Sequence, residues 1–192
     1  MKIAQQIVGV NQRLGNTAVP NMQGTTRAIF DSQVLAANAN QTITLFQGIS
    51  GRLYPFANIN NNRFEVGESL AITSIAFCGA EPDATFTDLA DELYENFATG
   101  ATVTNTFLFN LYIGNQRVIK DLDLNYSRFG IGEAYAAARQ KNVIHLETPI
   151  IIPPQIEFYA TITITANANL LARRFFLILA GQGTLLNTKS TF

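Results

Sequence analysis

Within residues 148–165, whose sequence is TPIIIPPQIEFYATITIT, apolar and polar side chains alternate from Gln155 to Thr165. A period of two is the signature of a β-strand with one buried face and one solvent-exposed face. The apolar positions of the series are Ile156, Phe158, Ala160, Ile162 and Ile164. Burying each of the large side chains contributes roughly 1.5–3 kcal/mol. Pro153 and Pro154 lack the backbone N–H that a central strand needs, so they predict the entry to a strand or an edge position.

A tight hairpin is predicted around Gly114-Asn115, a two-residue turn between strands over residues 107–113 and 118–124. In the return strand, alternation places Val118, Leu122 and Leu124 on one side and Asp121 and Asp123 on the other. The return strand therefore has one apolar side and one acidic side.

Residues 70–77 are apolar on both faces, which predicts a central strand covered on both sides. We expect Cys78 to end this strand and Gly79 to break it. Shorter runs predict further strands at residues 28–30 continuing to 34–35, at 42–46, at 143–147 and at 175–179. The last of these is expected to end at Gly181 and Gly183.

One amphipathic helix is predicted over residues 85–97. Its apolar side chains recur every three or four positions, at Phe86, Leu89, Ala90, Leu93 and Phe97. Thr85 can cap its N-terminus, with Asp88 three residues later. A second segment, residues 132–140, has the composition of either a short helix or a loop.

The strand count and spacing predict an all-β chain, a single jelly-roll-like antiparallel β-sandwich with one inserted α-helix. An immunoglobulin-type sandwich fits less well, because the chain has no tryptophan and only one cysteine. We divide the chain into an extended N-terminal arm (1–26), the sandwich with its helix insertion (27–183) and a C-terminal tail (184–192).

Charged residues form only 14% of the chain, against roughly 25% in typical soluble domains. Low charge reduces repulsion between copies and so favours association. Both terminal regions are basic and the middle of the chain is acidic. The charged residues predicted to lie at contacts between copies are Lys2, Arg13, Arg27, Arg173, Arg174, Asp88, Asp91, Glu92 and Glu95. The same basic termini allow contact with nucleic acid, although so few charges fit solvated side chains better.

Catalytic chemistry has one candidate, the pair His145 and Glu147, two positions apart on one strand face. A histidine hydrogen-bonded to its strand neighbour is the simpler interpretation, because no nucleophile motif accompanies the pair. With one histidine and Cys78 as the only cysteine, a zinc site of the usual kind cannot form in a single chain. The acidic residues do not follow calcium-loop spacing, and no phosphate-binding glycine loop occurs. We therefore expect no catalytic residues, no metal and no cofactor.

Cys78 cannot form an intrachain disulfide, and Met1 is not followed by an apolar segment of signal-peptide length. No apolar run reaches the roughly 20 residues that span a bilayer. We expect synthesis in the cytoplasm without processing, and no membrane span.

Three segments, GESLAITSIAFCG, FLFNLYIGNQRVIKDLDL and PIIIPPQIEFYATITI, resemble jelly-roll capsid proteins of icosahedral viruses, particularly small phage virion proteins. The resemblance covers residues 27–181 in strand order. It implies a virion structural protein, a capsid shell subunit or a minor or decorating capsid protein that self-assembles with copies of itself and other virion proteins. In such a family the terminal arms contact neighbours. The acidic helix insertion departs from the pattern.

Three functions follow as expectations. The first is the virion structural protein, located in the virion and not an enzyme. The second is a jelly-roll module that binds a glycan or receptor through loops bearing tyrosines, although tryptophan, the usual sugar platform, is absent. The third is an enzyme that uses His145 and Glu147.

Overall fold

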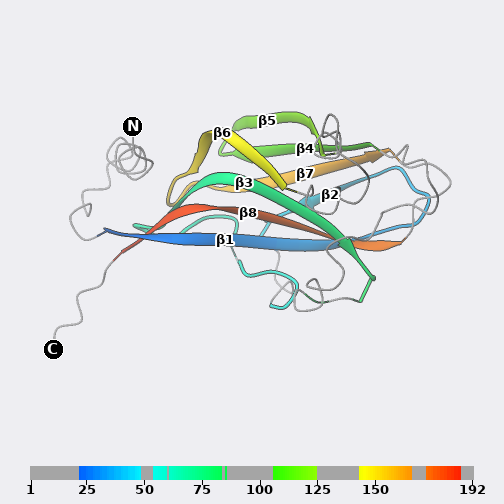
Figure 1. Ribbon diagram of the computed structural model, residues 1–192, viewed down its shortest axis with the longest axis horizontal. Coiled ribbons are helices and arrows are strands. Elements are labelled where there is room, and N and C mark those ends of the chain that lie inside the picture. Colours follow the sequence, from blue (N-terminus) through cyan, green and yellow to red (C-terminus); the bar gives the residue numbers. More distant parts are fainter. Residues whose placement is uncertain are drawn as a thin grey trace, which may run out of the picture.

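The computed structural model describes residues 22–48, 54–59, 61–83, 85, 106–124, 143–165 and 172–186. These residues form an all-β sandwich of two four-stranded antiparallel sheets (Figure 1). The predicted helix at 85–97 lies outside the described residues except for Thr85, and the segment 132–140 lies wholly outside them.

The first sheet has the order β1-β8-β3-β6 and the second has the order β2-β7-β4-β5. The strands of the first sheet are β1 (Met22–Leu35), β8 (Arg173–Leu186), β3 (Ser69–Ala80) and β6 (Val143–Ile152). Those of the second are β2 (Gln41–Leu45), β7 (Phe158–Thr165), β4 (Thr106–Ile113) and β5 (Gln116–Asp123). The pairs β1·β8, β2·β7, β3·β6 and β4·β5 are nested, so the first described strand pairs with the last and the fourth with the fifth.

One core fills the space between the two sheets. On β7 the apolar series is buried, and the threonines between its members are partly or fully exposed, which confirms the predicted alternation. Phe107 of the second sheet stacks on Phe175 of the first, with ring centroids 6.2 Å apart, and Phe175 stacks on Phe77 at the same distance. The ring centroids of Phe64 and Phe158 lie 5.2 Å apart, so Phe64 extends the core towards the segment that joins β6 to β7.

The chain crosses from one sheet to the other at Pro153 and Pro154, which lie between β6 and β7. Their predicted position at a strand entry is confirmed. Gln155 follows with a φ of 61°, and its backbone N–H donates to the carbonyl of Phe64 at 3.0 Å. The predicted hairpin at Gly114-Asn115 is also confirmed, joining β4 and β5.

The terminal strands are longer than predicted. β1 begins at Met22, which pairs with Leu186, so residues 22–26 of the predicted arm and residues 184–186 of the predicted tail lie in the sheet. Gly181 and Gly183 do not end β8. A Cβ atom at position 181 would lie 1.9 Å from the carbonyl oxygen of Ala71, because β3 bulges against β8 at Thr73. The glycine permits this close approach of two backbones.

β3 likewise continues through Cys78 and Gly79 to Ala80, so the prediction that these residues end it was wrong. They pair with Phe176 and Phe175 of β8, and this pairing holds the backbone extended. The central position of β3, between β8 and β6, is as predicted.

The alternation predicted for the return strand of the hairpin was wrong in part. Val118 is 40% exposed, whereas Ile119 and Leu122 pack against the core. Asp121 adopts a φ of 48° and the pairing with β4 shifts register beside it, which exchanges the inward and outward positions.

Candidate functional site

The outer face of the β1-β8-β3-β6 sheet carries a second, smaller apolar cluster of Phe30, Cys78 and Phe176, all buried. Residues 54–59 lie along β1, the strand at one edge of this sheet. Asn58 binds this edge at both ends of its side chain, accepting from the N–H of Phe30 at 2.7 Å and donating to the carbonyl of Ala28 at 2.9 Å. We call this outer side of the sheet the covered face.

Arg174 of β8 joins the covered face to two other segments of the chain. Its Nε donates to the carbonyl of Pro82 at 3.0 Å, and its guanidinium lies 4.4 Å from the ring centroid of Phe56. Burial lowers the pKa of Arg174, and the nearby carboxylate of Asp83 partly opposes that shift. The charge is therefore enclosed between an aromatic ring and a backbone carbonyl of the same chain.

The other described cations predicted to contact neighbouring copies also have partners within the chain. Arg27 pairs with Glu68 at 2.9 Å and lies over the ring of Phe64 at 4.5 Å. Arg173 pairs with Glu81. The remaining candidates, Lys2, Arg13, Asp88, Asp91, Glu92 and Glu95, lie outside the described residues, so their role between copies stays a prediction.

The two terminal strands bring both terminal regions to one end of the sandwich. Met22 is the register partner of Leu186, so the chain enters β1 and leaves β8 side by side (Figure 1). Lys2 and Arg13 precede Met22 in the sequence, and Lys189 follows Leu186. The basic terminal regions are therefore attached to the fold at the same place.

The outer face of β2, β7 and β4 has a different composition, and we call it the threonine–tyrosine face. It consists of Thr42, Thr44, Leu108, Asn110, Tyr112, Tyr159, Thr161, Thr163 and Thr165. None of the three strands contains Asp, Glu, Lys, Arg or His. Such an uncharged face is suited to contact with another surface, because charged residues are depleted at the centre of protein interfaces.

Strand register arranges these side chains in rows across the sheet. One row aligns Thr42, Thr163 and Leu108, and the next aligns Thr44, Thr161 and Asn110. The hydroxyls of Thr42 and Thr163 lie 3.2 Å apart. In a third row, the rings of Tyr112 and Tyr159 stack with centroids 4.6 Å apart and an interplanar angle of 8°.

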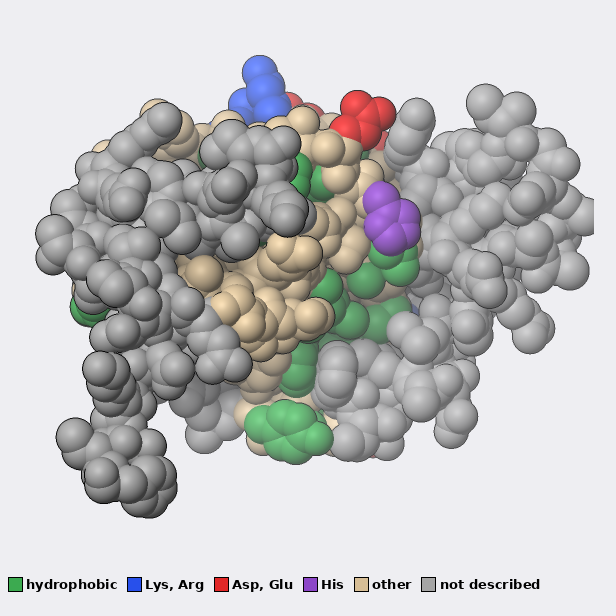
Figure 2. Space-filling view, turned by 60° about the vertical axis from the view of Figure 1, so that its left-hand side comes forward, with side chains coloured by type: hydrophobic (Ala, Val, Ile, Leu, Met, Phe, Trp, Pro, Cys, Tyr) green, Lys and Arg blue, Asp and Glu red, His purple; other side chains and the backbone are tan. Residues whose placement is uncertain are grey.

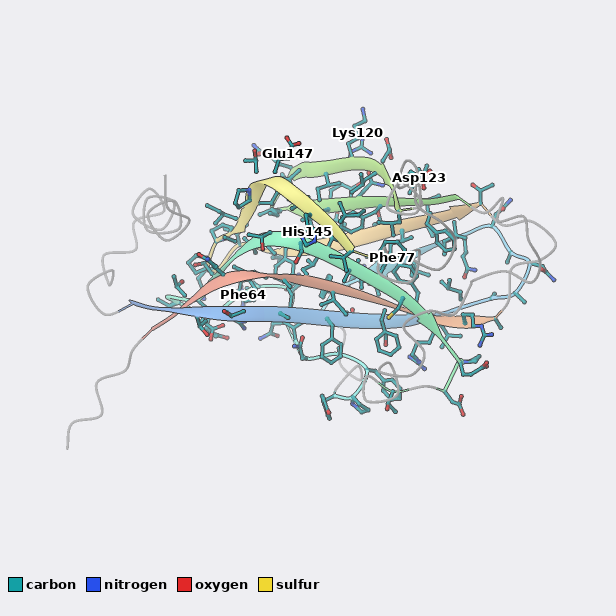
Figure 3. All side chains as sticks on the ribbon, viewed as in Figure 1. Phe64, Phe77, Lys120, Asp123, His145 and Glu147 are labelled. Atoms are coloured by element: carbon teal, nitrogen blue, oxygen red, sulfur yellow. The ribbon has the colours of Figure 1, made fainter. Side chains whose placement is uncertain are left out.

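β5 borders the threonine–tyrosine face and carries the charges of this sheet. Arg117 and Lys120 precede Asp121 and Asp123 along the strand, and Arg117 Nη1 lies 3.6 Å from Asp121 Oδ1. Figure 3 shows Lys120 pointing away from the sandwich. Asn110 links the face to this border, because its Oδ1 accepts from the backbone N–H of Asp121 at 2.8 Å and from Arg117 Nη1 at 3.3 Å.

His145 and Glu147 both lie exposed on β6, the edge strand of the first sheet. Figure 2 shows the histidine at the molecular surface, and Figure 3 shows Glu147 on the same strand. Within the part of the chain that the structure describes, no hydrogen bond joins the two side chains. Four residues of β6, 146–149, face the single Thr73 of β3, so His145 borders an irregularity that interrupts the ladder and Glu147 lies within it.

Within the described ranges, no cluster of three or more His, Cys, Asp or Glu side chains is arranged to hold a metal ion. In the same residues, no helix has the length and hydrophobicity to span a membrane. No family model, curated protein or solved structure matches the chain.

The sequence pattern pointed to charged residues, whereas the described geometry brings uncharged ones together. Alternate threonines in residues 161–165 were visible as a polar strand face. The signal that could have found the larger surface is the lack of charge shared by three separate strands, but their adjacency depends on the sheet order.

Proposed function

We propose that the protein is a virion structural subunit, built as a jelly roll, that acts by self-assembly rather than by catalysis. The observation that carries the proposal is the nested pairing of β1 with β8, β2 with β7, β3 with β6 and β4 with β5. Rolling such a nested hairpin into two sheets is the topology of a jelly roll, an architecture used in viral capsids. The additional pairs β3·β8 and β4·β7 are those that rolling creates.

Surface chemistry supports assembly. The chain is only 14% charged, its net charge is −1, and the outer face of three neighbouring strands, β2, β7 and β4, carries no ionisable group except two tyrosines. Attachment of both terminal regions at one end of the sandwich supports a role for them in reaching neighbouring subunits.

The full-length chain, purified and examined by electron microscopy over a range of concentration and salt, tests this proposal. Rings or closed shells of uniform size are expected. Salt dependence is expected where basic termini contribute to the contacts. Single dispersed subunits under every condition would contradict the proposal.

A glycan- or receptor-binding module is the second candidate, and the stacked pair Tyr112 and Tyr159 favours it. The two rings lie half-buried on the sheet surface beside Arg117, so the site offers aromatic surface and a hydrogen-bond donor together. A glycan array probed with the assembled and the dissociated protein tests it. No binding in either form would rule out a glycan ligand.

A further inference from the structure

We propose that the threonine–tyrosine face is the surface on which two copies of this chain pack against each other about a two-fold axis. This inference deepens the proposed function, since it identifies which surface makes one of the contacts between subunits. The covered face of the first sheet is a poorer candidate. Phe30, Cys78 and Phe176 on it are already buried within the chain.

The lack of charge restricts the occupant of the threonine–tyrosine face. A charged partner surface would lose hydration against β2, β7 and β4 without meeting an opposite charge there. A second copy of the same face brings no charge to the centre of the contact. A second copy of this face therefore loses no charge hydration at the centre of the contact. Other surfaces of this chain carry arginines and acids, which would lose it.

Hydrogen-bonding capacity also favours a second copy. Threonine and tyrosine hydroxyls both donate and accept, so a surface made of them can bond to itself, whereas rows of carboxylates or ammonium groups cannot. The pair Thr42 and Thr163 already shows this hydroxyl-to-hydroxyl contact within one chain. Threonine is also stiff at χ1, and tyrosine has few rotatable bonds, so ordering these rows costs little conformational entropy.

β5, the charged border of the face, is self-complementary. Arg117 and Lys120 precede Asp121 and Asp123 along the strand, and within one chain Arg117 Nη1 lies 3.6 Å from Asp121 Oδ1. A two-fold axis between the two copies, perpendicular to the strands and level with the row of Thr161, lays β5 antiparallel to its equivalent. Arg117 of each copy then lies near Asp123 of the other, and the charges form a polar rim along one edge of the uncharged centre.

Charge variants at Thr161, a half-buried residue in the middle of the central strand β7, test the inference in the full-length chain. Thr161 lies in the middle row of the face, opposite Asn110 of β4, and the axis passes beside this row. In Thr161→Asp or Thr161→Lys alone, like charges face each other across the axis. Self-association measured by sedimentation equilibrium should then weaken by at least about tenfold. An equimolar mixture of the two variants should recover it, because each Asp now faces a Lys. The matched control places the same two residues at Thr26, an exposed threonine of β1 on the other sheet.

Circular dichroism checks that each variant is folded, and Thr44, the register partner of Thr161 on β2, provides a second pair of variants should one fail to fold. Thr161 variants that associate as tightly as the wild type would overturn the inference while leaving the proposed function standing. Weakening without recovery in the mixture would also overturn it, because the face would then contact a different surface. A wild-type chain that stays monomeric at every concentration would instead overturn the proposed function, and this inference with it.

Discussion

The two sheets of the sandwich bury the same core, but their outer faces differ in composition. On the β1-β8-β3-β6 sheet, the outer face holds an apolar cluster, and Arg174 joins β8 to the segments containing Phe56 and Pro82. On the β2-β7-β4-β5 sheet, the outer face is a regular array of hydroxyls and aromatic rings without charge on three of its strands. The first face therefore contributes to the stability of the fold, and the second is the one that we propose for contact between copies.

The largest expected effect is on the free energy of unfolding, and it should differ between variants of the two faces. Phe176→Ala removes a fully buried ring from the covered face and should lower the free energy of unfolding by about 3–5 kcal/mol. Thr163→Ala, on the threonine–tyrosine face, should change it by less than about 1 kcal/mol. Urea unfolding of both variants at a concentration where the protein is monomeric makes the comparison. Equal losses would show that the two faces do not differ in this way.

The next effect concerns how closely β8 and β3 approach. Gly181→Ala places a Cβ against the carbonyl oxygen of Ala71 and should cost about 2–3 kcal/mol. Gly24→Ala is the control, since no atom lies within 4 Å of the added carbon, and alanine should be neutral or stabilising by up to about 1 kcal/mol. Thermal unfolding of the two variants distinguishes them. A tolerated Gly181→Ala would contradict the bulge at Thr73.

Arg174 is expected to act through its geometry as well as its charge. Arg174→Ala should destabilise the protein by about 1–2 kcal/mol, because it removes the bond to the Pro82 carbonyl and the contact with the Phe56 ring. Arg174→Lys keeps the charge but not the planar group, so it should recover only part of this loss. Denaturant unfolding of both variants provides the measurement. If Arg174→Lys were as stable as the wild type, the effect of Arg174 would be due to its charge alone.

The smallest expected effect lies on the threonine–tyrosine face itself. Stacking of Tyr112 on Tyr159 should give a coupling energy of about 0.5–1.5 kcal/mol in a double-mutant cycle with alanine. Thr42 and Thr161, which lie on the same face in different rows, serve as an uncoupled pair. A coupling energy of zero for the tyrosines would mean that the rings are not held in contact in solution.

Much of the fold could be predicted from local patterns. The alternation along β7 and the turn at Gly114-Asn115 depend on neighbouring residues alone, and both are confirmed. Strand ends were less predictable, because Gly181 resembles a terminator until its neighbour Ala71 is known. The inward and outward positions on β5 could not be read either, since the register shift beside Asp121 depends on pairing with β4.

The candidate site was harder to predict than the fold. Arg27, Arg173 and Arg174 stood out because the terminal regions are basic, yet each has a partner within the chain, and those partners are distant in sequence. The residues of an uncharged surface do not stand out in a linear sequence. This surface can be recognised only from the sheet order, which places β2, β7 and β4 side by side.

Light scattering on a sizing column, across a concentration series, measures whether the full-length chain associates with itself. We expect species whose masses are multiples of 21.0 kDa and whose population rises with concentration. Trimers, pentamers or larger closed species would agree with a shell subunit. A constant mass of 21.0 kDa at every concentration would contradict self-assembly.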